Sequence, residues 1–262
     1  MRRYWRTLLP ALAVADVLTP WALLYHHNPA PPSVMQRADQ PAMRTVGQTD
    51  GRWLALHEAY TQRARAGGIE ILFLGDSLTH GWLQQPFWRE QLRALGAVNF
   101  GIGGDRTQHL AWRLLHGEME MDPPPRACVL QIGTNNVDSD AAEEVVRGIA
   151  AIVQLLRSRW PDSVLLLLGL FPRGVRADNP LRERVRLVNQ GLRELVAAHG
   201  ASGELIFVDA AALMPLLRDG SLDLEFTLDY VHLTNEMYAR LGAALVEQLS
   251  QLRVIEGDGG WG

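Results

Sequence analysis

The chain has 262 residues, of which 47% are hydrophobic and 21% charged, and its formal net charge is −4. This composition predicts one globular domain with additional terminal segments and excludes a disordered or collagen-like chain. Lysine is absent, which excludes P-loop, Schiff-base and Ser-Lys chemistry. The slight acidic excess offers no basic surface to nucleic acid, and the single cysteine, Cys128, excludes an intrachain disulfide.

The N-terminal part of the chain differs in composition from the rest. Residues 7–25 follow three arginines and are apolar except for Asp16 and Thr residues, with two prolines among them. This pattern is typical of an export signal or a membrane anchor, and it predicts an exported or membrane-anchored protein; the alternative is an amphipathic or disordered cytoplasmic tail. From the N-terminus, the predicted parts are the apolar segment 1–27, a Pro-rich linker 28–44, the domain 45–255 and a flexible Gly-rich tail 256–262.

Short apolar runs alternate with longer segments of helical periodicity along the predicted domain. The runs are bounded by Gly, Asp or Pro, which is typical of strands buried on both faces. They lie at residues 69–74, 97–100, 127–132, 164–170 and 205–208. The clearest helical periodicity lies at residues 141–160, 181–198 and 235–252. Because no hairpin signal joins the strands, we expect a central five-stranded parallel sheet in a three-layer α/β/α sandwich, with ligands bound at the carboxyl ends of the strands.

Ser77 follows the first predicted strand, where the chain turns into a helix. A serine there can direct its hydroxyl into the cleft, with its own N–H at the positive end of the helix, so Ser77 is the candidate nucleophile. The alternative is that Ser77 only caps the helix. Thr79 stands where the nucleophile motif of the α/β-hydrolases requires a glycine, so that fold is disfavoured. We interpret Asp76 as a structural residue that accepts hydrogen bonds from the turn.

The next two strands end in residues that can supply hydrogen-bond donors. Gly104 belongs to a glycine-rich turn that lets a backbone N–H approach an anionic oxygen. A Rossmann-type cofactor turn would need a glycine where Arg106 stands, so a dinucleotide-binding site is disfavoured. Asn135 follows the third strand, and its side-chain amide can stabilise a developing oxyanion. The structural alternative for the segment of Gly104 is a tight strand-to-helix turn, and that for the segment of Asn135 is an Asx turn.

Asp229 and His232 lie three residues apart near the end of the predicted domain. A carboxylate at this spacing can bond one ring nitrogen of the histidine and fix its tautomer, so that the other nitrogen accepts the proton of the nucleophile. Either residue alone would more often be a solvated side chain. Their joint occurrence with a serine and two oxyanion donors, each at the end of a different element, indicates nucleophilic acyl transfer that needs no metal and no cofactor.

The four segments together resemble the SGNH (GDSL) hydrolase family, whose name records Ser, Gly, Asn and His from four motifs. Here these letters fall on Ser77, Gly104, Asn135 and His232, and Asp229 completes the triad. The resemblance implies a flavodoxin-like α/β/α fold and a serine esterase that forms an acyl-enzyme. It also implies an oxyanion hole made by the N–H groups of Ser77 and Gly104 and by the side chain of Asn135.

Longer stretches are similar to the catalytic subunits of platelet-activating-factor acetylhydrolase of the brain type. These stretches are residues 50–53, 99–105, 112–114, 169–174 and 179–183. The resemblance spans about residues 50 to 250 and implies removal of short acyl groups, chiefly acetyl, with a phospholipid ester as one candidate substrate. A carbohydrate O-acetylesterase acting on a polysaccharide or cell-wall glycan would use the same five residues, and a catalytically silent binding module is the alternative outside enzymes. A homodimer is kept as a candidate assembly.

Leu78, Thr134 and Val231 each neighbour a predicted catalytic residue. We expect their side chains to turn into the acyl pocket, to narrow it and to favour acetyl over long acyl chains. Packing in the core is the alternative for Leu78 and Val231. Because valine is smaller than leucine, we expect the pocket to accept butyryl esters as well.

Other polar and aromatic residues receive a structural interpretation. His109 and His116 have no third ligand in reach along the sequence, so we expect no metal site there. Arg173 and Arg176, in the loop after the fourth predicted strand, are expected to be solvated charges; the alternative is a contact with a phosphate or an acidic substrate. Trp53, like other tryptophans of the predicted helices, is expected to be a packing anchor.

Overall fold

The computed structural model describes residues 37–44, 51–199 and 204–255. The chain divides into two compact units, Met1–Met35 and Gln36–Gly262, and all described residues belong to the second unit. The predicted apolar segment and the predicted C-terminal tail lie outside the described residues. Within the described residues, no helix combines the length and the apolar composition needed to cross a membrane.

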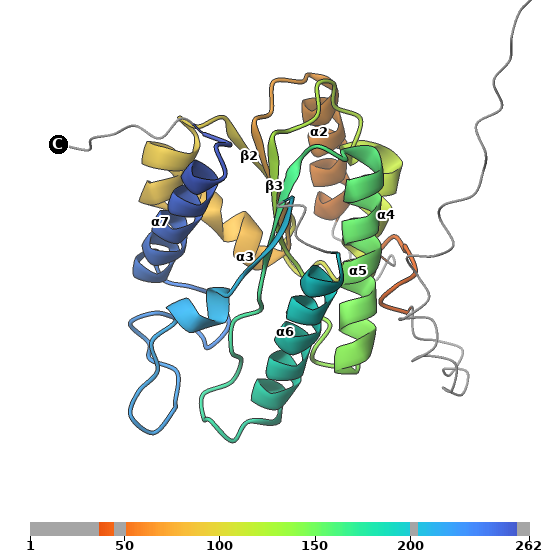
Figure 1. Ribbon diagram of the computed structural model, residues 1–262. Helices are drawn as coiled ribbons and strands as arrows, with labels where there is room; N and C mark the ends of the chain where they lie inside the picture. Colours follow the sequence, from red (N-terminus) through yellow and green to blue (C-terminus); the bar gives the residue numbers. More distant parts are fainter. Residues whose placement is uncertain (1–36, 45–50, 200–203, 256–262) are drawn as a thin grey trace, which may run out of the picture. The chain divides into compact units, whose positions relative to one another are not determined.

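Strands and helices alternate along the described chain, as the sequence predicts (Figure 1). The strands are β1 (Ile71–Gly75), β2 (Ala97–Gly101), β3 (Ala127–Gln131), β4 (Val164–Leu168) and β5 (Leu205–Val208). The α-helices are α2 (Arg52–Arg65), α3 (Ser77–His80), α4 (Thr107–Arg113), α5 (Ala142–Arg159), α6 (Pro180–Ala198) and α7 (Asn235–Gln251). Short 3₁₀- or π-helical turns lie at η2 (Gly81–Gln84), η3 (Trp88–Leu92), η4 (Leu114–Glu118) and η5 (Ala210–Leu213).

The five strands form one sheet in the order β2-β1-β3-β4-β5, and all neighbouring strands are parallel. This confirms the predicted parallel five-stranded sheet. β5 has the predicted bounds, whereas each of the other strands differs from its predicted bounds by one or two residues, and β4 shows why. The backbone N–H of Leu170 donates to Asn189 Oδ1 at 2.7 Å, and Asn189 Nδ2 donates to the Leu170 carbonyl at 2.9 Å. A side chain of α6 thus replaces the next strand as the partner of Leu170.

Successive strand residues enter two separate hydrophobic clusters, one on each face of the sheet. In β1, Leu72 and Leu74 belong to one cluster, and Ile71 and Phe73 belong to the other. The first cluster contains residues of α2, α4, α5 and α6, whereas the second contains residues of α3, η2, η3 and α7. Figure 1 accordingly shows α5 and α6 on one side of the strands and α7 on the other. The predicted three-layer α/β/α arrangement is therefore confirmed.

Local sequence signals determine where the long helices begin. Asn179 caps α6 by accepting a hydrogen bond from the Leu181 N–H at 2.9 Å, and Pro180 occupies the first helical position. Thr234 caps α7 in the same way, with its hydroxyl accepting from the Met237 N–H at 3.4 Å. Asn179 ends the loop between β4 and α6, and Thr234 ends the loop between η5 and α7. The two caps therefore help to fix where these loops lie relative to the sheet.

Residues 37–44, which the sequence interpretation assigns to the linker, contact the domain. The Thr107 hydroxyl donates to the Ala38 carbonyl at 2.7 Å, and the Ala42 N–H donates to the Gln108 carbonyl at 3.0 Å. The side chain of Ala38 is buried. The part of the chain that packs on the sheet layers therefore includes residues upstream of the predicted start of the domain.

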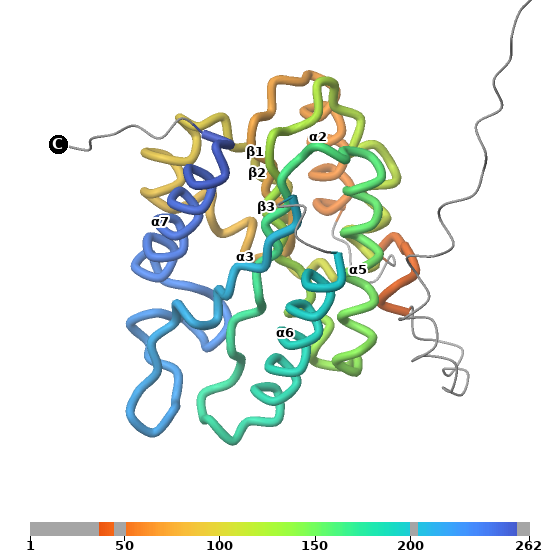
Figure 2. Tube along the Cα trace, in the orientation of Figure 1, coloured from red at the N-terminus to blue at the C-terminus, as the bar shows by residue number. Residues whose placement is uncertain are grey.

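The loops at the carboxyl ends of the strands lie close together. Figure 2 shows the loops that follow β4 and β5 running side by side. They are joined by a hydrogen bond of 2.9 Å from the Leu222 N–H to the Val175 carbonyl. A guanidinium of α6 adds a second link, because Arg182 Nη2 donates to the Gly220 carbonyl at 3.4 Å. This edge of the sheet carries the residues that the sequence singles out.

Candidate active site

Ser77 is the first residue of α3 and directly follows the turn out of β1. The turn is so tight that a Cβ atom on Gly75 would lie 2.1 Å from the Gln131 carbonyl oxygen and 2.1 Å from Thr79 Oγ1. Asp76 Oδ1 accepts a hydrogen bond from the Leu78 N–H at 3.0 Å, which confirms the structural interpretation of Asp76. Because α3 has only four residues, few peptide dipoles add up at Ser77, and the expected electrostatic contribution of the helix is small.

Three side chains form a continuous series of polar contacts that begins at Ser77. The Ser77 Oγ lies 3.0 Å from His232 Nε2, although the two residues are 155 positions apart in the sequence. His232 Nδ1 lies 2.8 Å from Asp229 Oδ2. This order of hydroxyl, imidazole and carboxylate allows the ring to accept the hydroxyl proton while the carboxylate orients the ring. The side chains of His232 and Asp229 are 43% and 56% exposed, so water reaches the group.

The loop before α7 holds Asp229 and His232 in this arrangement. Asp229 Oδ1 accepts backbone hydrogen bonds from Val231 at 3.1 Å and from His232 at 2.8 Å. The turn requires the left-handed conformation of Tyr230, whose φ is 64°, a conformation that non-glycine residues rarely adopt. Burial acts to raise the pKa of Asp229, but the hydrogen bonds from His232 outweigh it, and the pKa lies below its ordinary value. Asp229 is therefore a carboxylate at neutral pH.

The loops after β2 and β3 lie against Ser77 and against each other. A Cβ atom on Gly103 would lie 3.8 Å from the Ser77 Cβ, and Gly104 has a left-handed φ of 77°. Asn135 Nδ2 donates to the Asp105 carbonyl at 2.9 Å. Because a side-chain amide carries two hydrogens, this contact leaves one hydrogen for a further acceptor. The structure thus brings the predicted oxyanion residues to one edge of the sheet, and their catalytic role stays a prediction.

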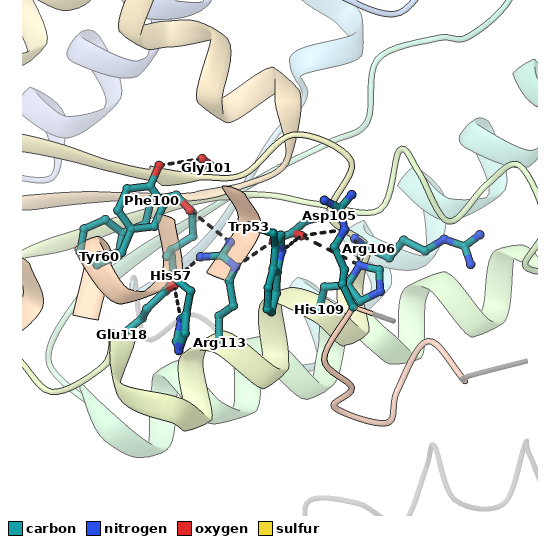
Figure 3. A network of polar contacts seen from close by, with 12 residues as sticks. Trp53, His57, Tyr60, Phe100, Gly101, Asp105, Arg106, His109, Arg113 and Glu118 are labelled. Carbon is teal, nitrogen blue, oxygen red and sulfur yellow. Dashed lines mark hydrogen bonds and ion pairs between the residues drawn. The ribbon is translucent and has the colours of Figure 1, made fainter. Parts of the chain in front are cut away.

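A buried ionic network stands behind these loops, and the sequence interpretation missed it (Figure 3). Arg113 is fully buried, and its Nε donates to Asp105 Oδ2 at 2.8 Å while its Nη1 pairs with Glu118. Trp53 Nε1 donates to Asp105 Oδ1 at 2.7 Å, so Trp53 is more than the expected packing anchor. His57 Nδ1 lies 2.9 Å from Glu118 Oε1. The network fixes Asp105, whose backbone carbonyl accepts the hydrogen bond from the side-chain amide of Asn135.

Arg173 corrects a sequence expectation, because it is not a solvated charge. Its side chain is only 13% exposed, and its Nη2 lies 3.2 Å from Asp138. Its Nη1 donates to the Thr134 carbonyl at 2.6 Å, directly before Asn135. Arg173 therefore supports the loop after β3. Arg176, in contrast, is exposed and pairs with its neighbour in the same loop, as expected.

The three predicted acyl-pocket residues lie beside the residues they neighbour in sequence, with different degrees of burial. Leu78 and Thr134 are buried, and Val231 is half-buried. Leu78 belongs to the hydrophobic cluster on the α7 face, and the Tyr238 hydroxyl donates to its carbonyl at 2.7 Å. A role of the three side chains in selecting the acyl group stays a prediction.

The two histidines of α4 and η4 have local partners. His109 Nδ1 accepts from the Arg106 N–H at 3.1 Å, and burial lowers the pKa of His109 to about 4, so the ring is neutral. His116 Nδ1 lies 2.7 Å from the Trp112 carbonyl. Within the described ranges, no group of three or more His, Cys, Asp or Glu side chains could hold a metal ion.

Asp76 predicts a measurable pH dependence of stability. It is fully buried, its Oδ2 has no hydrogen-bond partner among the described residues, and burial raises its pKa to about 7. In the unfolded chain the pKa is about 4. The folded state therefore binds the proton more tightly, and the free energy of unfolding falls as the pH rises from about 4 to about 7, by roughly 4 kcal/mol. We expect Asp76→Asn, which keeps the acceptor for the Leu78 N–H, to abolish this fall.

The measurement is thermal unfolding of both proteins from pH 4 to pH 8. The melting temperature of the wild type should drop relative to that of Asp76→Asn as the pH rises. Asp178→Asn is the matched control, because Asp178 is exposed and its hydrogen bond with Arg176 lowers its pKa. Parallel curves for the wild type and Asp76→Asn would show that the buried carboxyl does not titrate in this range.

Comparison with known sequences identifies the family of this site. Residues 73–240 match the model of the GDSL-like lipase/acylhydrolase family. The chain is 41% identical over 225 residues to platelet-activating factor acetylhydrolase IB subunit alpha1 of Homo sapiens, which covers 86% of this chain and 94% of that protein. It is 38% identical over 205 residues to subunit alpha2 of Mus musculus, which covers 78% of this chain and 86% of that protein.

Solved structures with the same fold include esterases. A GDSL-like lipase from Bacteroides thetaiotaomicron matches with a TM-score of 0.60 and 18% identity, covering 74% of this chain and 97% of that chain. A variant of an acetylxylan esterase from Geobacillus stearothermophilus matches with a TM-score of 0.56 and 17% identity, covering 70% of this chain and 94% of that chain. At these identities the likeness concerns the fold. Taken with the family match and the sequence relatives, the chain belongs to the GDSL-like lipase/acylhydrolase family and is a carboxylic ester hydrolase.

Proposed function

We propose that the chain hydrolyses short-chain carboxylic esters, chiefly acetyl esters, through a Ser77-His232-Asp229 triad and an acyl-enzyme. The observation that carries this proposal is the 3.0 Å contact between Ser77 Oγ and His232 Nε2, continued by the 2.8 Å contact between His232 Nδ1 and Asp229 Oδ2. A serine that only capped α3 would need no histidine at this distance.

In the first step, His232 Nε2 takes the hydroxyl proton of Ser77 as Ser77 Oγ attacks the ester carbonyl. Asp229, a carboxylate at neutral pH, holds the Nδ1 proton and stabilises the imidazolium that forms. His232 then gives its proton to the leaving alcohol, and the acyl group stays on Ser77. In the second step the same histidine activates water, which releases the acid and restores the serine.

The negative charge of the tetrahedral intermediate needs donors beside Ser77. We assign this task to the N–H groups of Ser77 and Gly104 and to the free amide hydrogen of Asn135. The 2.9 Å hydrogen bond from Asn135 Nδ2 to the Asp105 carbonyl supports the assignment, because it orients the amide without using both of its hydrogens. Loss of one such donor typically lowers kcat by about 10²- to 10³-fold.

The surroundings of His232 favour an amphiphilic ester as the substrate. Leu224 and Leu228, in the same loop, are 55% and 67% exposed, and the Leu228 N–H donates to the His232 carbonyl at 2.7 Å. Exposed apolar side chains this close to the proposed base suit the hydrocarbon part of a lipid better than the polar surface of a glycan. We therefore place a short-chain acyl phospholipid before an acetylated polysaccharide as the substrate class.

A series of p-nitrophenyl esters from acetate to decanoate tests the acyl selectivity. We expect kcat/KM to be highest for acetate, to remain substantial for butyrate and to fall steeply for longer chains, because Leu78, Thr134 and Val231 narrow the acyl pocket in our proposal. Val231→Ala should shift the optimum toward longer chains, with Val246→Ala in α7 as the control. A higher efficiency on decanoate than on acetate would rule out the narrow pocket.

Acetate release from two natural-type substrates separates the candidate substrate classes. We compare an acetyl-glycerophospholipid with an acetylated polysaccharide at equal ester concentration. Faster release from the phospholipid supports the lipid class, and faster release from the glycan replaces it by the carbohydrate O-acetylesterase function. Absence of release from either substrate and from the aryl esters would favour a binding module.

Two further proposals rest on the sequence alone. We propose that residues 7–25 direct export or anchor the protein to a membrane, since a basic start followed by an apolar stretch is typical of such segments. These residues lie outside the part of the chain that the structure describes. We also propose that the chain forms a homodimer.

A further inference from the structure

The guanidinium of Arg44 lies against the glycine turn after β2. A Cβ atom on Gly104 would lie 2.2 Å from Arg44 Nη2 and 3.9 Å from Nη1, so the guanidinium occupies the space that a side chain at this position would need. The neighbouring Gly103 faces Ser77, where a Cβ atom would lie 3.8 Å from the Ser77 Cβ. Consecutive Cα atoms are about 3.8 Å apart, so one residue of backbone separates the serine contact from the arginine contact.

Arg44 has weaker polar partners than Arg106 and Arg173, the two arginines that contact the loop after β3. Its Nε is 3.9 Å from Asp105 Oδ1 and is buried without a hydrogen bond among the described residues. Asp105 is already engaged, because Trp53 and Arg113 donate to its two oxygens. The distance of 3.9 Å is too long for a hydrogen bond. The charge of Arg44 is therefore only partly compensated within the described residues.

Arg106 and Arg173 show the difference, since each has both a carbonyl and a carboxylate partner. Arg106 Nε donates to the Asn135 carbonyl at 3.1 Å and its Nη2 lies 3.6 Å from Asp140. Arg173 pairs with the Thr134 carbonyl and with Asp138. Their hydrogen bonds hold the loop after β3 in place. Arg44 donates to no backbone carbonyl of the described residues, which distinguishes it from a purely structural arginine.

The segment that carries Arg44 is docked independently of this guanidinium. Residues 37–44 are attached by the hydrogen bonds from Thr107 to the Ala38 carbonyl and from the Ala42 N–H to the Gln108 carbonyl. The side chain of Arg44 is 15% exposed, so solvent reaches part of it. Residues 37–44 thus bring the positive charge of Arg44 beside Gly104, although the hydrogen bonds that dock this segment do not involve the guanidinium.

We propose that Arg44 is a binding subsite for an anionic group carried by the ester substrate, such as a phosphate, sulfonate or carboxylate on its alcohol part. This inference rests on the esterase function proposed above. A guanidinium presents several donors in a fork that matches the oxygens of such anions, and its hydrogen bonds to them are stronger than those between neutral groups. An ester held at Ser77 would place a nearby anion beside Gly104, within reach of Arg44.

A matched pair of aryl esters tests the subsite: phenyl acetate, which is neutral, and 4-sulfophenyl acetate, which carries one negative charge. We expect Arg44→Gln to lower kcat/KM for the anionic ester by roughly tenfold and to change kcat/KM for phenyl acetate by less than about twofold. Arg37→Gln is the control, because Arg37 lies in the same segment but is exposed and paired with Asp39. It should leave both values unchanged.

The outcomes separate this inference from the esterase function. An equal loss on both esters would make Arg44 a general contributor to the oxyanion hole or to folding, and no loss on either would remove it from the site; both results overturn the proposal. Titration with inorganic phosphate, followed through the Gly104 amide resonance, gives a readout that does not depend on hydrolysis. Saturation in the wild type at roughly tenfold lower phosphate than in Arg44→Gln supports the subsite even if neither ester is hydrolysed, whereas identical curves contradict it.

Discussion

Ser77→Ala should lower kcat/KM for phenyl acetate by about 10⁴-fold or more, because no other described group stands 3.0 Å from His232 Nε2 with a hydroxyl to be activated. The remaining oxyanion donors and substrate contacts would sustain only a small residual rate. Steady-state hydrolysis, with circular dichroism to verify folding, measures the effect. The control is Ser250→Ala, since the hydroxyl of Ser250 donates within α7 to the Val246 carbonyl.

The triad also predicts how mutations combine. Ser77 and His232 act on the same proton, so the double alanine variant should be no slower than either single variant within about threefold. Independent contributions would instead multiply. Retention of more than about a tenth of the wild-type rate in Ser77→Ala would contradict the assignment of the nucleophile.

Arg113→Leu should lower the free energy of unfolding by roughly 3–5 kcal/mol, because it leaves Asp105 and Glu118 buried without the guanidinium that bonds both (Figure 3). Burial opposes the charge of Arg113, but the two carboxylates outweigh it and raise its pKa, so the guanidinium is charged in the folded protein. Urea unfolding measures the loss. Arg113→Lys keeps the charge with fewer hydrogen bonds and should lose less stability than Arg113→Leu.

A matched surface variant separates the effect of burial from that of charge. Arg186→Leu removes an arginine whose ion pair with Glu183 is exposed on both sides, and we expect it to leave the midpoint of urea unfolding nearly unchanged, because solvent screens such a pair. If Arg113→Leu and Arg186→Leu unfold at the same urea concentration, the buried network contributes no net stability. Failure of Arg113→Leu to fold, with a folded Arg113→Lys, agrees with our expectation.

The sheet and the candidate triad could be predicted because their signals are local. Each buried strand is a short apolar run, and the parallel direction of the strands follows from the absence of hairpin signals. Ser77, Asn135, Asp229 and His232 stand within a few residues of a strand end or a helix start. A parallel sheet brings such positions to one edge, which is why residues 155 positions apart meet at 3.0 Å.

The buried charges could not be predicted, because a charged residue in a sequence carries no mark of burial. Nothing in the sequence around Arg113 and Glu118 marks either residue as buried, and only the packing of α2 against η4 shows that both are inside. Trp53 could suggest packing but not its 2.7 Å hydrogen bond to Asp105. Arg173 was misassigned for the same reason, since its burial depends on how the loop after β4 folds over the loop after β3.

The place of Arg44 could not be predicted either, because it depends on how residues 37–44 pack against the domain. Its position follows from the docking of residues 37–44 on α4 and α5, and the composition of this stretch predicts an extended linker. Pro-rich composition describes the freedom of an isolated segment and not the surface onto which it packs. The sequence therefore offered no signal that an arginine would lie beside Gly104.

Covalent labelling tests the central claim most directly, namely that the Ser77 hydroxyl is activated by His232. The full chain is incubated with a fluorophosphonate, and the modified peptide is identified by mass spectrometry. We expect one adduct on Ser77 in the wild type, none in Ser77→Ala and much slower labelling in His232→Ala. An intact, folded wild-type protein that carries no adduct, or that carries it on a different residue, would contradict the account.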